Sequence, residues 1–150
     1  MVTVHEVPPN KLIGDISEKL KDMNNIESPD WAPYVKTGVH KEKAPLEEDW
    51  WYKRVSAILR SVYVKGPIGI SKLRGKYGGK QERGSKPSRV AKGSGSVVRT
   101  ALKQLEDEGL IKKENKGRMI TPEGQSLLDN SAYEILKKMA EDDPELTKYL

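Results

Sequence analysis

The strongest pattern of apolar and polar positions along this chain lies between residues 87 and 110. Its second half carries apolar residues three and four positions apart, which is the spacing of one face of an α-helix. These residues are Val98, Ala101, Leu102 and Leu105. Ser94 and Ser96 are alternative N-caps for this helix, and Gly109 is the expected stop signal at its end. The pattern therefore predicts an amphipathic helix with one buried face.

Helical spacing also predicts a helix over residues 10–23, a second over 46–64 and a third over 121–140. Residues 70–77 predict a shorter helix or a turn. Three acids fall in the expected first turn of the helix at 46–64, where their charge would complement the helix dipole. They are Glu47, Glu48 and Asp49.

Two short strands are predicted at residues 110–113 and 118–121, because an Asn- and Gly-containing turn separates them. Residues 78–92, by contrast, are rich in Gly, Lys and Arg, and we predict a flexible basic loop there. The order helix, short helix, helix, two-stranded wing, helix is that of the winged variant of the helix-turn-helix. We therefore predict a mainly α, winged-helix fold with a short two-stranded β-hairpin wing and extra N-terminal helices, in a single domain over residues 1–150.

Composition narrows the class of protein. The 150 residues suit one domain with a modest core, since 35% are hydrophobic and 33% are charged. Cysteine is absent, which excludes a disulfide framework and thiolate chemistry. No apolar run approaches the roughly 18 residues that span a bilayer, and the N-terminus lacks the pattern of a signal peptide. We therefore expect a cytoplasmic protein without a membrane partner.

Charge is spread unevenly along the chain. The net charge is −4 over residues 1–52, +12 over 53–99 and −3 over 100–150, which gives +5 in total. A segment of such high positive charge repels itself unless an anionic partner neutralises it, and nucleic acid is the expected partner. A membrane surface is disfavoured because Gly and Pro interrupt the segment, which cannot form one amphipathic helix. A basic loop that is merely solvated is the alternative.

The start of the helix at residue 94 is suited to bind phosphate. A helix N-terminus offers free backbone N–H groups and a partial positive charge, and the small residues 93–95 leave room for close approach. The candidate nucleic-acid contacts are Lys53, Arg54, Arg60, Lys72, Arg74, Lys80, Arg83, Lys86, Arg89, Lys92, Ser94 and Arg99. The first three form a solvated helix face unless the fold places them beside the basic loop.

Catalytic and metal-binding patterns are lacking. His5 and His40 are 35 residues apart and have no cysteine partners, so they predict no zinc site. Residues 75–81 resemble a phosphate-binding loop, but they have one residue too few between the glycines and Gln81 in place of Ser or Thr. The acids at 141–143 are expected to be a solvated tail. We predict no enzyme activity, cofactor, metal or small-molecule substrate.

Several short motifs follow one another in a specific order and spacing. They are Asp49-Trp50-Trp51-Tyr52, Tyr77-Gly78-Gly79, Pro87-Ser88, Gly93-Ser94, Gly117-Arg118 and Ile120-Thr121-Pro122-Glu123-Gly124. Together they resemble the S19e family of small-subunit ribosomal proteins of archaea and eukaryotes. The resemblance covers nearly the whole chain, although we find no family pattern in its acidic tail.

This resemblance implies a winged-helix-like protein that binds ribosomal RNA in the head of the small subunit and is needed for subunit assembly and pre-rRNA maturation. It implies ribosomal-protein neighbours and a monomer away from the ribosome. The family's basic surface corresponds here to Arg54, Arg60 and residues 89–99. Trp31 and Trp50 correspond to structural positions that anchor the N-terminal helix to the winged unit.

A winged-helix DNA-binding transcription regulator is the alternative function. Such a regulator joins its first two recognition elements by a tight turn of a few residues. The long basic segment at 78–92 suits an irregular RNA surface better than a regular major groove.

Overall fold

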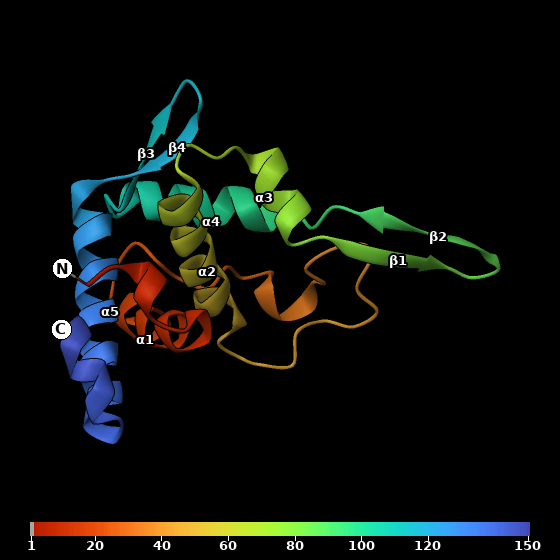
Figure 1. Ribbon diagram of the computed structural model, residues 1–150. Coiled ribbons are helices and arrows are strands. Elements are labelled where there is room, and N and C mark those ends of the chain that lie inside the picture. The colour runs from red at the N-terminus through yellow and green to blue at the C-terminus, as the bar shows by residue number, and fades with distance from the viewer. Residues whose placement is uncertain (1) are drawn as a thin grey trace.

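The structure, a computed structural model of the chain, describes residues 2–150. Within that range, five α-helices pack around one apolar core, and two β-hairpins extend from it (Figure 1). The helices are α1 (Pro9–Lys21), α2 (Trp50–Lys65), α3 (Ile70–Lys76), α4 (Gly95–Asp107) and α5 (Pro122–Asp142). The strands are β1 (Gly79–Arg83), β2 (Lys86–Ala91), β3 (Ile111–Glu114) and β4 (Gly117–Ile120). Short 3-10 helices are η1 (Val4–Glu6), η2 (Ala32–Tyr34) and η3 (Pro144–Tyr149).

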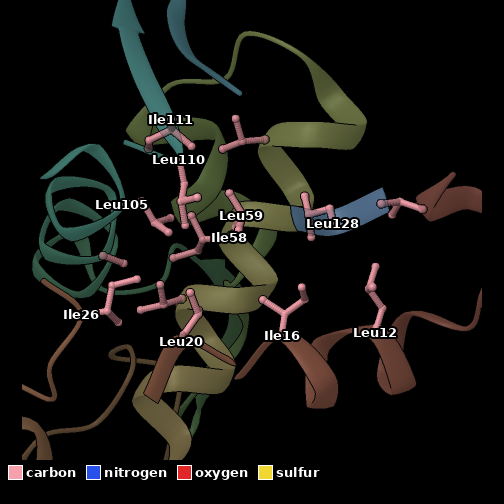
Figure 2. Packing of buried hydrophobic residues seen from close by; sticks show 14 of the residues in the cluster. Leu12, Ile16, Leu20, Ile26, Ile58, Leu59, Leu105, Leu110, Ile111 and Leu128 are labelled. Carbon is pink, nitrogen blue, oxygen red and sulfur yellow. The ribbon is translucent and has the colours of Figure 1, made fainter. Parts of the chain in front are cut away.

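Four helices supply most of the core. Figure 2 shows apolar side chains converging on one centre: Leu12, Ile16 and Leu20 of α1, Ile58 and Leu59 of α2, Leu105 of α4 and Leu128 of α5. All of these side chains are buried. Burial of one such side chain stabilises a fold by about 1.5–3 kcal/mol, so this cluster holds the N-terminal helix to the rest.

The predicted winged-helix arrangement is confirmed. Helices α2, α3 and α4 follow one another, and β3 and β4 form the antiparallel wing. Ile68, between α2 and α3, pairs with Arg118 of β4 through two backbone hydrogen bonds of 3.2 and 2.9 Å. A Cβ at Gly117 would overlap the Ile68 backbone, and the φ of Gly117 is +133°. Glycine is therefore required where the wing meets this link.

Helix α4 forms as its sequence pattern predicts. Its stripe of Val98, Ala101, Leu102 and Leu105 is buried. The hydroxyl of Ser94 accepts a hydrogen bond from the backbone N–H of Val97, so Ser94 is the N-cap and Ser96 lies inside the helix. Gly109 follows the last turn with a φ of +80°, which is the expected stop.

The expected start of the second helix is wrong by one turn. The helix α2 begins at Trp50, so the three acids at 47–49 precede it instead of occupying its first turn. Two of them pair with lysines: Glu47 with Lys53 at 2.7 Å, and Asp49 with Lys21 at 3.4 Å. These ion pairs hold the acids against α1 and α2 instead.

The prediction of a loop at residues 78–92 is also wrong. Strands β1 and β2 pair antiparallel, with Lys80 opposite Val90 and Gln81 opposite Arg89, and they project away from the helices (Figure 1). A two-residue turn joins them, in which Gly84 has a φ of +73°. Gly-Ser between two extended runs is a recognised hairpin signal. The Gly- and Lys-rich composition concealed it, because these strands bury almost no apolar surface.

Glycines let the two strands converge at the base of this hairpin. A Cβ at Gly78 would overlap the Ala91 carbonyl oxygen, and one at Gly93 would lie 2.9 Å from the Tyr77 carbonyl oxygen. Neither site has room for a side chain, because the opposing atoms belong to backbone.

Trp51 of α2 joins three parts of the chain. Its indole is 0% exposed and packs edge-on against Trp31, with ring centres 5.7 Å apart. Its Nε1–H donates to the side-chain oxygen of Gln104 at 3.0 Å, and the Gln104 amide donates to the Glu27 carbonyl at 2.8 Å. The loop after α1 is thereby held to both α2 and α4.

Helix α5 packs against α1 and α2 and covers the core there. Its start is the predicted one: the Thr121 hydroxyl accepts from the Gly124 N–H at 3.2 Å. The Tyr63 hydroxyl of α2 donates to Asp129 at 2.7 Å, and burial together with this bond raises the pKa of Tyr63 to about 12.

None of the helices within residues 2–150 is long and apolar enough to cross a membrane.

We expect Trp51→Ala to lower the free energy of unfolding by about 3–5 kcal/mol, because it empties a fully buried site and leaves Gln104 without its donor. Urea denaturation followed by circular dichroism measures the change. Tyr133→Ala on the exposed side of α5 is the control. An unchanged midpoint for Trp51→Ala would contradict the role assigned to this indole.

Two glycines separated by three positions test the hairpin base. Gly78→Ala is expected to weaken protection of the β1–β2 amides from hydrogen exchange, since the new methyl collides with backbone. Gly75→Ala is the matched control: nothing lies within 4 Å of its Cβ, and alanine favours its helix by up to about 1 kcal/mol. Equal protection of the hairpin in both variants would show that the base is not tight.

Candidate nucleic-acid interface

The first candidate site is a hollow of about 340 Å³ at the start of α4. Three of the residues predicted to contact nucleic acid line this hollow: Arg74 of α3, Lys92 and Ser94. Lys36, from the loop before α2, lines it as well. Three cationic side chains thus lie around the N-terminus of a helix whose first two N–H groups, those of Gly95 and Ser96, have no hydrogen-bond partner within residues 2–150.

Backbone hydrogen bonds assemble this hollow from segments far apart in the sequence. The N–H of Ser94 donates to the Thr37 carbonyl at 2.9 Å, and that of Gly93 donates to the Arg74 carbonyl at 2.8 Å. The Nε–H of Arg74 in turn donates a hydrogen bond of 3.0 Å to the Gly93 carbonyl. Gly38 and Gly93 form an isolated β-bridge. The positions of Lys36 and Arg74 are therefore set by main-chain contacts.

Arg99 lies one turn further along α4 and is exposed. A Cβ at Gly95 would lie 2.8 Å from Nη1 of Arg99 and 3.5 Å from Nε of Arg74, so both guanidinium groups flank the first turn of α4. The ammonium group of Lys92 donates to the Ser71 hydroxyl at 2.7 Å. The structure thus brings together Arg74 of α3, Arg99 of α4, and Lys92 and Ser94 of the segment before α4.

The projecting hairpin carries four further candidates, Lys80, Arg83, Lys86 and Arg89. Arg83 donates to the Pro87 carbonyl through Nε at 3.0 Å and Nη2 at 2.7 Å, which fixes its direction across the turn. Lys80, Lys86 and Arg89 are exposed. The hairpin therefore presents its positive charge well away from the core.

The three candidates on α2 differ from one another. The Arg54 guanidinium lies 4.2 Å from the centre of the Tyr77 ring, and its burial lowers the pKa of Arg54 while leaving the group charged. Arg60 is half-buried, and its buried Nε has no hydrogen-bond partner within residues 2–150. Lys53 is neutralised by Glu47 and Asp49.

A second basic hollow of about 520 Å³ lies beside α3, lined by Lys65, Lys72 and Lys76. Burial lowers the pKa of Lys76, and repulsion from Arg60 and Lys65 lowers it further. Lys65 and Lys76 were not among the candidates from the sequence, although they belong to its most basic segment. Lys36 was hidden because the first 52 residues carry a net negative charge.

The candidate cations have little compensation from acids. Among the residues that the structure describes, Lys53 is the only one of the eleven candidate cations in an ion pair. Elsewhere acids and lysines pair along α1 and the wing. A folded protein that leaves ten cations without acidic partners on neighbouring elements carries a strongly positive field there. In residues 2–150, no three His, Cys, Asp or Glu side chains gather as a metal site.

The fold and this surface define a class: a winged-helix protein with a positively charged face suited to a polyanion. The model of the family described as ribosomal protein S19e matches residues 3–138. The chain is 47% identical over 150 residues to small ribosomal subunit protein eS19 of Thermoplasma acidophilum, with all of both chains covered. It is 44% identical over 154 residues to that of Haloarcula marismortui, with 99% of each chain covered.

A eukaryotic relative gives the same result. The chain is 40% identical over 141 residues to small ribosomal subunit protein eS19A of Schizosaccharomyces pombe, with 93% of this chain and 98% of the relative covered. The chain therefore belongs to the ribosomal protein S19e family, whose members are structural ribosomal proteins and not enzymes. The resemblance found in the sequence motifs and the expectation of no enzyme activity are both confirmed.

Arg54 is expected to stabilise the fold as well as to contribute charge. Arg54→Ala should lower the free energy of unfolding by about 1–2 kcal/mol, because a half-buried cation over an aromatic ring is worth that much. Arg99→Ala is the matched control, since Arg99 is exposed, and we expect a change within about 0.5 kcal/mol. Urea denaturation distinguishes the two. Equal stability of both variants would contradict a structural role for Arg54.

Proposed function

We propose that this protein is a structural component of the small ribosomal subunit, located in the cytoplasm, and that it binds ribosomal RNA. We further propose that this binding is needed for small-subunit assembly and pre-rRNA maturation. The names of its relatives support the first statement. The proposed contact surface, called the basic face below, consists of Arg54, Arg60, Lys72, Arg74, Lys80, Arg83, Lys86, Arg89, Lys92, Ser94 and Arg99.

The observation that supports RNA binding most directly is the lack of acidic partners on this face. Ten cations of the basic face are without an ion pair within residues 2–150. Beside them, burial lowers the pKa of Lys76, and repulsion from Arg60 and Lys65 lowers it further. Phosphate groups would supply the missing negative charge and release counterions, so binding weakens steeply as salt rises.

The hairpin β1–β2 favours RNA over duplex DNA. A DNA-binding helix-turn-helix joins its two helices by a tight turn so that the second can enter the major groove. Here the whole hairpin lies between α3 and α4 and projects beyond them (Figure 1). A projecting ribbon of basic residues fits the irregular grooves of folded RNA. For this reason, and because of the family, we set aside the transcription-regulator alternative.

The opposite end of the molecule favours protein neighbours. Helix α5 and η3 lie far from the hairpin β1–β2, and they include the four acids Glu141, Asp142, Asp143 and Glu145 near the junction of the two helices (Figure 1). Such a surface repels phosphate. We propose that it faces solvent or other ribosomal proteins of the subunit head, and that the protein is a monomer away from the ribosome.

Reversing one exposed charge of the basic face tests the proposed function. We expect Arg99→Glu to leave the melting temperature nearly unchanged, since Arg99 is exposed. The fraction of the variant that sediments with small subunits in a sucrose gradient should fall, and more so as salt is raised. In a strain with this variant as its sole copy, small-subunit rRNA precursors should accumulate.

Lys137→Glu on the exposed side of α5 is the matched control, with the same change of charge away from the basic face. Undiminished sedimentation of Arg99→Glu with small subunits would contradict the proposed surface. Absence of the unaltered protein from small subunits would contradict the proposed function altogether.

A further inference from the structure

A third hollow, of about 530 Å³, lies between the segment 37–47 and the first turns of α2. Its wall is apolar on one side: Pro45 and Leu46 from the segment, and Trp50 and Ala57 from α2. Cations stand around it. We propose that this hollow, called the Trp50 hollow, receives the base of an unpaired RNA nucleotide while nearby cations bind its phosphates. The inference rests on the proposed RNA-binding function and adds a base-binding site to it.

The apolar wall is accessible. Trp50 is half-buried, and its ring packs perpendicular to the buried Trp51 ring, with centres 5.6 Å apart and planes at 84°. Leu46 is 94% exposed beside it and adds nothing to the core. Leu46 and Pro45 also line a neighbouring hollow on the other side of the segment. An indole that packs against a buried tryptophan and is flanked by the exposed Leu46 is the kind of platform on which unpaired bases stack.

The charge around the Trp50 hollow favours an anionic occupant. Lys41, Lys43 and Arg54 line it, and none of the three has an ion pair within residues 2–150. Glu47 is the one acid in its lining, and Lys53 neutralises it at 2.7 Å. An aromatic surface beside unpaired cations matches a nucleotide, in which a planar base is joined to phosphate. The volume lies within the range of sites that enclose such small groups.

The Trp50 hollow adjoins the basic face. Thr37 lines it, and the Thr37 carbonyl accepts the hydrogen bond from Ser94 at the start of α4. Lys36 and Gly38, on either side of Thr37, line the hollow at α4 instead. An RNA strand whose phosphates lie at the start of α4 therefore needs to cross only the segment 36–38 to place its next base here. This proximity favours RNA over a peptide as the occupant.

The test compares two strands of equal charge with the full-length protein. One is a fluorescein-labelled oligouridine of about ten nucleotides, and the other is an abasic ribose-phosphate strand of the same length. We expect the unaltered protein to bind the oligouridine at least about fivefold more tightly than the abasic strand, as measured by fluorescence anisotropy. Leu46→Ser and Trp50→Ala should bring this ratio close to one without weakening the abasic complex.

Two further variants complete the design. Trp50→Phe keeps an aromatic platform and should retain the preference, but the quenching of tryptophan fluorescence by oligouridine should disappear. Tyr133→Ser, an exposed aromatic on α5, is the control and should behave as the unaltered protein. Leu46→Ser removes an exposed side chain, so its result is independent of any loss of folding in Trp50→Ala.

Equal affinity of the unaltered protein for both strands would overturn the base-binding site and leave the proposed function standing. A preference for oligouridine that persists in Leu46→Ser and Trp50→Ala would overturn it too. If these variants instead lose only their place in the subunit, a protein neighbour occupies the hollow and the inference is wrong. Failure to bind either strand at low salt would contradict the proposed function itself.

Discussion

The close approach of backbone at Gly93 is the constraint on which the functional surface depends. At this residue the hairpin ends, α4 is about to begin, α3 donates and accepts hydrogen bonds through Arg74, and Gly38 of the N-terminal loop forms a β-bridge. A side chain at 93 would collide with the Tyr77 carbonyl. Four segments meet here, and each contributes cations to the surface around it. The site is therefore positioned by main-chain contacts, which are less mobile than the lysines and arginines that they carry.

The positive charge that the proposed RNA binding requires is unfavourable in the free protein. The apolar core and its Trp51–Gln104 connection hold α1, α2 and α4 together without help from the basic face. Beside that face, burial lowers the pKa of Lys76, and repulsion from Arg60 and Lys65 lowers it further. A polyanion removes this repulsion on binding. The same arrangement that weakens the free protein thus favours its place in a ribonucleoprotein.

Aromatic residues of α2 connect the core to the surface. Trp51 is fully buried, and Trp50 packs perpendicular to it and reaches the surface. Arg54, one turn further along α2, lies over the ring of Tyr77 at the end of α3. The buried Trp51 therefore fixes the position of α2, and α2 in turn fixes the positions of Trp50 and Arg54 at the surface.

The sequence alone predicted those helices and strands whose ends are marked by capping or turn residues. The helix α4 with its cap at Ser94, the wing, and the Thr121 start of α5 were predictable because capping and turn residues act within a few positions of one another. The hairpin β1–β2 and the start of α2 were mispredicted. Strands that bury almost nothing leave no apolar pattern, and the acids at 47–49 found lysine partners outside their own helix.

The primary sequence thus settled the winged-helix order, the buried stripes and the positive charge of residues 53–99, since each of these depends on neighbours along the chain. It held no signal that Lys36, from a segment with net negative charge, would lie beside Arg74 and Lys92, or that Trp50 and Leu46 would share a hollow with Lys41 and Lys43. The first of these groupings arises from hydrogen bonds between backbone segments some 20 to 60 residues apart, such as Ser94 to Thr37 and Gly93 to Arg74, and the second from the way in which the segment 41–46 lies against the start of α2. They exist only when the chain is folded, because separation along the sequence carries no information about which turns will meet.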